Sequence, residues 1–157
     1  MSRTLAGTGL VIRLILRRDR LALAVWILLA LAGLSFYAAS EAALHPTAEL
    51  QRAYAAELDD PATTALLGPV YAPTLGGLIA WRAGAQGMII MGLASLLLVI
   101  RHTRAEEEAG RRELLGSGVV GRLAPLTAAL TVVLGTNLLI AVLLTALLTP
   151  ALASHGL

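Results

Sequence analysis

Several absences restrict what this sequence can do before any motif is considered. The chain contains no cysteine, which excludes disulfides, thiolate metal sites and a cysteine nucleophile. All 12 basic residues are arginine, and without lysine the chain cannot form the phosphate-binding motif G-x-x-x-x-G-K-[ST]. The three histidines, at positions 45, 102 and 155, are too widely spaced to suggest a ligand set. We therefore expect no catalytic residues, no metal and no cofactor.

Charge is also scarce, since charged residues make up 14% of the chain and a typical soluble domain has about 25%. The net charge of +2 gives no argument for a nucleic-acid partner. Hydrophobic residues reach 57%, and the mean hydropathy is +0.79. This composition indicates a chain that is largely embedded in membrane lipid.

Three uncharged apolar runs are long enough to cross a bilayer, which takes about 20 helical residues. We place the transmembrane helices at 21–40, 83–100 and 123–150, and the second run can start a few residues earlier. Pro125 suits the first turn of the third, where its missing N–H costs little. The sequence thus predicts an all-α integral membrane protein with three transmembrane helices.

A cleavable signal peptide is the alternative for the first run, with Arg17, Arg18 and Arg20 as its basic flank. Small residues at 38–43 resemble a cleavage site. However, the run is longer than a usual signal core, and two further spans follow it. We therefore predict a retained span.

Arginine counts predict the orientation, because cytoplasmic loops are enriched in Arg and Lys. Five arginines precede the first span, two (Arg52 and Arg82) lie between spans one and two, and five lie between spans two and three. This distribution predicts a plasma-membrane protein with a cytoplasmic N-terminus and an extracytoplasmic tail, 151–157. Segment 101–122 is then cytoplasmic, and the 41–82 loop lies outside.

The segments outside the spans show helical patterns. In 1–20, Leu10, Val11, Leu14 and Ile15 share one helical face, which predicts an interfacial helix on the membrane lipid. A cytosolic extension of span one is the alternative. In the 41–82 loop we expect a short helix from Asp60-Pro61 to Gly68. The acids of this loop suit a solvated face about as well as a cation or substrate gate.

Two amides lie within the predicted spans, Gln86 and Asn137. Polar residues in a span normally face a bundle interior or a wet path. Both are candidates for a transport pathway or for a helix-packing hydrogen bond. Small residues at four-residue spacing, such as Gly84 beside Ala80, predict close helix approach in span two.

The most charged segment of the chain, 101–122, lies between two apolar runs. Thr103 and Glu106 have the spacing of a capping box, and Glu107–Arg111 and Glu108–Arg112 are i, i+4 pairs. We predict a short helix from about Arg104 to Leu115 that docks a cytosolic subunit, or else a solvated loop that only sets topology. Residues 116–121 match G-x-G-x-x-G, but no strand precedes them, so they predict a flexible joint rather than a dinucleotide site.

These residues carry a resemblance to a known family. The run RHTRAEEEAGRRELL, together with GGLIAWR (76–82) and GPVY (68–71), resembles the permeases of polyketide (tetronasin-type) antibiotic exporters, which are ABC exporter permeases. The resemblance implies an elbow helix before span one and a coupling helix that presses into a cleft on a separate ABC ATPase subunit. The implied docking residues are Arg104, Glu106, Glu107, Glu108, Gly110, Arg111, Arg112, Glu113, Leu114 and Leu115.

Family permeases have six spans in each half, whereas this chain has three. We therefore expect the N-terminal part of a permease that works with the remaining permease helices or a second permease copy. ATP would be hydrolysed by the partner, so the chain itself is not expected to be an enzyme. The alternative is a stand-alone three-span accessory membrane protein without transport activity.

Overall fold

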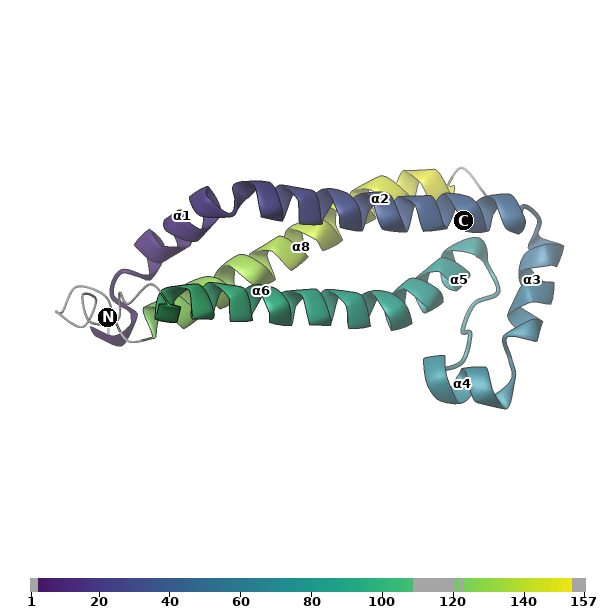
Figure 1. Ribbon diagram of the computed structural model, residues 1–157. Coiled ribbons are helices and arrows are strands. Elements are labelled where there is room, and N and C mark those ends of the chain that lie inside the picture. The colour runs from purple at the N-terminus through teal and green to yellow at the C-terminus, as the bar shows by residue number, and fades with distance from the viewer. Residues whose placement is uncertain (1–2, 109–120, 122, 154–157) are drawn as a thin grey trace. The chain divides into compact units, whose positions relative to one another are not determined.

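The structure is a computed structural model in which residues 3–108, 121 and 123–153 are described. Every element among them is helical, which confirms the all-α prediction (Figure 1). The elements are a 3₁₀ turn η1 (Arg3–Leu5), α1 (Thr8–Arg18), α2 (Arg20–Leu44), α3 (Ala48–Glu57), α4 (Pro61–Leu67), α5 (Leu75–Arg82), the π-helix η2 (Ala83–Gly87), α6 (Met88–Glu108) and α8 (Ala124–Ala153).

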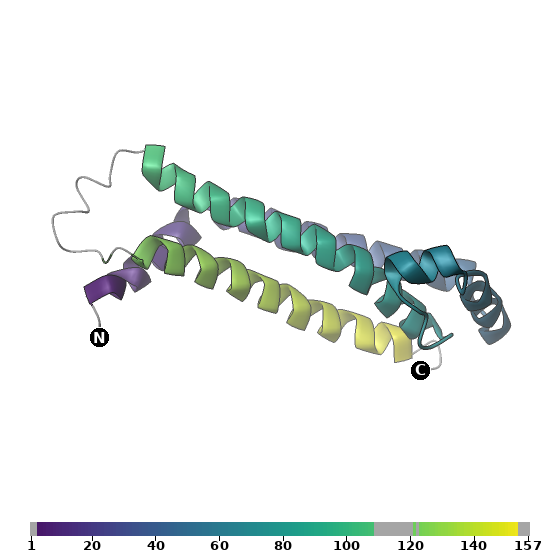
Figure 2. The same cartoon turned by 90° about the horizontal axis from the view of Figure 1, so that it is seen from below.

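Three continuous helical stretches are long and apolar enough to span a membrane. They run over Arg20–Leu44, Leu75–His102 and Ala124–Ala153. The second begins earlier than residue 83, since Thr74 caps α5 by accepting a hydrogen bond from the Gly77 amide at 3.2 Å. The third carries Pro125 in its first turn as predicted, and α8 continues through Pro150 to Ala153. Figure 2 shows α8, coloured from green to yellow, as one continuous helix.

By its internal contacts the chain divides into two compact units. Unit 1 comprises Met1–Ile27 and Met91–Leu139, and unit 2 comprises Leu28–Ile90 and Ile140–Leu157. Each unit has its own hydrophobic cluster and its own set of polar contacts.

In unit 1, α1 packs against the first half of α8. Ile15 and Leu23 form a buried cluster with Ala128 and Val132, and Val11 and Ile12 pack on it. Ala128 has no exposed surface, because its small side chain lets the neighbouring helix come close. Leu10 and Leu14, on another side of α1, are more than half exposed. Helix α1 thus has one apolar face for its own unit and a second that is free for lipid.

In unit 2, the cluster of Ala38, Leu75 and Ile79 joins α2 to α5, with Leu148 of α8 packed against it. The loop helices α3 and α4 both begin after a side-chain cap, which is Thr47 for α3 and, as predicted, Asp60 for α4. Asp60 accepts hydrogen bonds from the amides of Ala62 and Thr63 at 2.9 and 3.0 Å, and α4 ends at Gly68, where φ is 82°. The predicted helix from Asp60-Pro61 to Gly68 is therefore confirmed.

Side chains in unit 2 bond to backbone groups left open at the helix ends. Gln51 of α3 donates to the His45 carbonyl at 3.0 Å and accepts from the Leu75 amide at 3.1 Å. The Trp81 indole donates to the Gly68 carbonyl at 2.9 Å. His45 stacks on Tyr54 with ring centroids 4.3 Å apart. These contacts fix the loop between α2 and α5 without a disulfide.

Glycine packing in span two differs from the predicted spacing pattern. A Cβ built at Gly84 or Gly87 would meet no described atom within 4 Å. The close approach occurs at Gly77, where an added Cβ would lie 2.7 Å from the Cβ of Ala72 and closer still to its carbonyl oxygen. The close contact that requires a glycine is therefore the one between Gly77 and the loop that leads into α5.

Candidate functional site

The predicted docking segment is only partly described. Helix α6 carries its backbone without a break to Glu108, so Arg104, Glu106, Glu107 and Glu108 are helical. The other predicted docking residues, namely Gly110, Arg111, Arg112, Glu113, Leu114 and Leu115, lie outside the described residues. The docking role of the segment remains a prediction.

The expected helix start at Thr103 is wrong. Thr103 lies inside α6, which begins at Met88 and continues from span two. A capping residue is needed only where the first backbone N–H groups of a helix lack partners. Within a continuous helix those N–H groups bond to carbonyls of the preceding turn, so a capping box at Thr103 and Glu106 has no free donors to satisfy.

Where α6 leaves its apolar run, an ionic cluster joins it to the start of span one. Asp19 is the single residue between α1 and α2, and its side chain is only 6% exposed. Its Oδ1 accepts a hydrogen bond from Arg101 Nη2 at 2.7 Å, and its Oδ2 lies 3.3 Å from His102 Nδ1. A buried carboxylate is stable only when such partners compensate for its lost hydration.

The backbone of Asp19 also connects the two helices. Its N–H donates to the Ile15 carbonyl at 2.9 Å, and its carbonyl accepts from the Leu23 amide at 2.8 Å. The hydrogen bonding of α1 thus passes through Asp19 into α2, while φ of −103° and ψ of 13° turn the chain there (Figure 1). The junction is held by backbone bonds, and the side chain is left to reach α6.

The start of span three contacts the same N-terminal region. The Gly121 amide donates to the Ala6 carbonyl at 2.9 Å, and the Leu123 amide donates to the Thr4 carbonyl at 3.1 Å. Segment Thr4–Asp19 therefore contacts the chain both before and after the predicted docking residues. All of these contacts lie within unit 1.

Asp19 was not among the functional residues predicted from the sequence. It is the first acid of the chain, surrounded by Arg17, Arg18 and Arg20, and the next acid is Glu41. A lone carboxylate among arginines at a membrane boundary was the available signal. Its partner could not be read from the sequence, because Arg101 is 82 positions away.

The two amides of the predicted spans differ in environment. Asn137 of α8 donates from Nδ2 to the Ser95 hydroxyl of α6 at 2.8 Å, and that hydroxyl bonds to the Met91 carbonyl at 2.6 Å. Asn137 thus makes an interhelical hydrogen bond within unit 1. Gln86 lies in the π-helix η2 and is exposed. Whether either amide contacts a transported compound stays a prediction.

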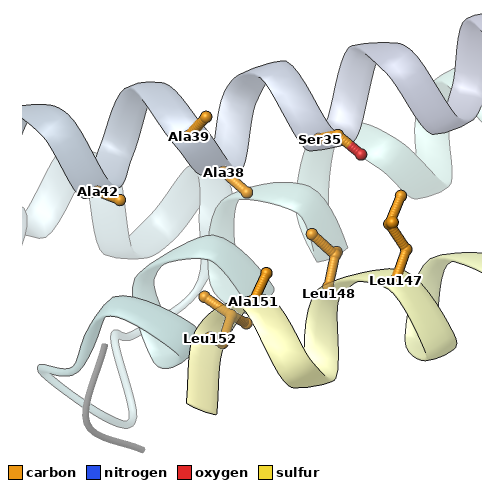
Figure 3. A pocket seen from close by; sticks show the side chains of 8 residues that line it. All are labelled: Ser35, Ala38, Ala39, Ala42, Leu147, Leu148, Ala151 and Leu152. Carbon is orange, nitrogen blue, oxygen red and sulfur yellow. The ribbon is translucent and has the colours of Figure 1, made fainter. Parts of the chain in front are cut away.

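An apolar cavity of about 280 Å³ lies between α2 and α8 in unit 2. Figure 3 shows Ser35 and three alanines of α2 opposite Leu147, Leu148 and Leu152 of α8. The Ser35 Oγ is buried and has no hydrogen-bond partner within the described residues. The described residues contain no group of three His, Cys, Asp or Glu side chains that could hold a metal ion.

No family model matches the chain. The chain is similar to a multidrug efflux system permease protein of Mycobacterium tuberculosis (strain ATCC 25618 / H37Rv), with 46% identity over 134 residues. The match covers 84% of this chain and 24% of the relative, so the chain spans about a quarter of the length of that permease. The likeness covers most of the chain.

Proposed function

We propose that the chain is a permease component of an ATP-driven exporter and supplies its first three spans. The likeness to a multidrug efflux permease carries this proposal. It agrees with a chain that has three helices of spanning length. The remaining helices of the transport path would come from the rest of the permease or from a second copy.

The transported compounds are proposed to be amphiphilic, such as polyketide antibiotics. Two observations support this class: the relative is a multidrug efflux permease, and the cavity between α2 and α8 is lined by alanine and leucine with one serine. Sites that bind such molecules are mostly apolar with few polar groups.

We further propose that segment 101–122 is cytoplasmic and docks a separate ATPase subunit. The five arginines of this segment favour the cytoplasmic side. Helix α6 extends past the end of its apolar run to Glu108. With the apolar run in the bilayer, this charged helical end would project beyond the hydrocarbon core. A rigid helical extension is suited to transmitting a push from a partner to the span.

Co-purification tests the docking proposal. The tagged chain is isolated from membranes of its own host, and bound ATPase is detected by photolabelling with azido-ATP. Reversing the charges of Glu108, Arg111 and Glu113 should remove the labelled subunit. A matched control reverses Glu49, Arg52 and Glu57 of α3, all exposed, and should retain it. Equal labelling of the two variants would refute the docking proposal.

The orientation is tested with single cysteines, which this chain permits because it has none of its own. A membrane-impermeant maleimide added to intact cells should label Ala53→Cys in α3. It should label Ser117→Cys only after the membrane is opened. The reverse pattern would overturn the proposed topology.

A further inference from the structure

The N-terminal segment contacts both described ends of the docking segment, 101–122. On one side, Asp19 binds Arg101 at 2.7 Å and approaches His102 at 3.3 Å. On the other side, the amides of Gly121 and Leu123 donate to the carbonyls of Ala6 and Thr4. Segment Thr4–Asp19 therefore holds the last turns before the docking residues and the first residues after them.

The two attachments differ in chemistry. Backbone bonds fix Gly121 and Leu123, because the chain is not yet helical there and its amides are open to partners. At Arg101 the backbone is already in a helix, so only a side chain can make the connection. Asp19, buried and charged, makes that connection through its carboxylate.

An ion pair with one buried partner is weak evidence for stability, because desolvation of that partner offsets much of the attraction. Such a pair can instead favour one arrangement over others, because a buried carboxylate left without its partner is strongly disfavoured. Here the arrangement that Asp19 selects is the contact of the α1–α2 junction with the end of span two. Arg18, a further cation near His102, adds to the positive surroundings.

Helix α1 is itself fixed to α8. Ile15 is 7% exposed in a cluster with Ala128 and Val132, which have 0% and 5% exposure. An apolar core of this kind resists sliding, because packed side chains have few alternative arrangements. The N-terminal segment is therefore joined to span three by packing and to span two by charge.

We propose that segment Thr4–Asp19 acts as a mechanical brace, with Asp19 as the positioning residue that makes spans two and three move together when an ATPase pushes on the docking segment. The inference rests on the proposed function. Without the Asp19–Arg101 pair, a push at the charged end of α6 would be passed poorly to α1, and ATP hydrolysis would be largely uncoupled from transport. The hydrogen bond between Asn137 and Ser95, farther along the span, would remain as a second link between α6 and α8.

The test compares transport with ATPase binding in the same membranes. Arg101→Gln is the first variant, because Arg101 is half exposed and its loss is tolerable for folding. Asp19→Asn is the second. Each should reduce ATP-dependent efflux of ethidium at least tenfold while azido-ATP labelling of the co-purified subunit stays unchanged. The charge-exchanged double variant Asp19→Arg with Arg101→Asp should recover efflux to within about threefold of wild type.

Matched controls carry the same chemical changes elsewhere. Arg20→Gln alters an exposed arginine next to Asp19, and Asp59→Asn alters an exposed acid of the loop before α4. Both should retain wild-type efflux. His102→Gln, which removes the second neighbour of the carboxylate, should reduce efflux less than Arg101→Gln.

Amide hydrogen exchange on the purified chain gives a readout that does not depend on the ATPase. In Arg101→Gln, the rate of amide hydrogen exchange should rise at least tenfold in residues 101–108 and at Gly121 and Leu123. The double variant Asp19→Arg with Arg101→Asp should restore the protection of these amides. The brace would be overturned if Arg101→Gln had normal efflux and normal amide hydrogen exchange. It would also be overturned if the two single variants and the charge-exchanged double variant behaved alike. If no azido-ATP-labelled subunit co-purified with the wild-type chain, the proposed ATPase docking would be refuted. The amide exchange result would then still test whether the brace exists.

Discussion

Unit 1 joins its elements through side-chain pairs, Asp19 with Arg101 and Asn137 with Ser95, whereas unit 2 joins its elements through side chains that bond to loop backbone. Gln51 bonds to the His45 carbonyl and the Leu75 amide, and Trp81 bonds to the Gly68 carbonyl. The difference follows from helix length. Long helices satisfy their own backbone groups, so only side chains remain to connect them.

Short helices leave more open backbone groups per residue, because each end exposes unpaired amides or carbonyls. Unit 2 contains α3, α4 and α5, and the backbone groups that Gln51 and Trp81 bond lie at or next to helix ends. In the described part of unit 1, open groups near η1 and at Gly121 and Leu123 form backbone bonds. The kind of contact in each unit therefore depends on how much of that unit is uninterrupted helix.

The largest effect is expected from Gly77→Val in unit 2. The added carbons would collide with Ala72, so unfolding free energy should fall by about 3 kcal/mol. Denaturation by SDS in mixed micelles, followed by circular dichroism, measures it.

Gly84→Val is the control, because no described atom lies within 4 Å of its added Cβ. It should change stability by well under about 1 kcal/mol. Equal losses in the two variants would show that β-branching, and not the contact with Ala72, is responsible.

Asn137→Ala tests the interhelical bond of unit 1. Loss of the bond to Ser95 should lower stability by about 1.5 kcal/mol, at the upper end of measured interhelical bonds in membranes. The same SDS titration applies, with Ser95→Ala and the double variant completing a thermodynamic cycle.

Thr131→Val is the control for Asn137→Ala, since the Thr131 hydroxyl bonds only within its own helix, to the Thr127 carbonyl. It should have almost no effect. A double-variant cycle without coupling energy would contradict the role assigned to Asn137.

Trp81→Phe tests the loop contacts of unit 2. Removing the indole N–H leaves the Gly68 carbonyl without this donor and should cost about 1 kcal/mol. Trp26→Phe is the matched control, because its indole N–H has no acceptor in the described part of the chain. Faster amide exchange in α4 and α5 should appear in the first variant and be missing from the second.

The smallest effect concerns the cap of α4. Hydrogen bonds from Thr63, with a further one from the Ala62 amide, hold the pKa of Asp60 below its usual value. A lowered pKa means that the cap is fully formed above the ordinary pKa of Asp, roughly 4, and is lost only as pH falls through the lowered value. Amide protection of Ala62 and Thr63 should therefore stay constant from neutral pH to about pH 4 and decline below it.

Asp60→Asn should make this protection independent of pH, since an amide caps in a neutral form. Asp59→Asn, one residue away, should leave the pH profile of the wild type. A profile that already declines near neutral pH would contradict the assigned cause.

Local chemistry explains which sequence predictions were confirmed. The three spanning-length helices follow from uninterrupted apolar runs, and the α4 cap follows from Asp60 followed by Pro61. The Thr103 cap was wrong because the same local signal occurs inside a helix that span two had already started. A capping motif identifies a helix start only when no helix precedes it.

The helical class, the number of apolar spans and the loop helix at Pro61–Leu67 could all be predicted from the sequence, because each depends on residues that are neighbours along the chain. Which polar residues pair became clear from the packed fold. Asp19 with Arg101 and Asn137 with Ser95 are 82 and 42 positions apart, and a sequence pattern carries no record of such distances. These pairs exist because packed helices bring their side chains together where the helical backbone has no bonds left to offer.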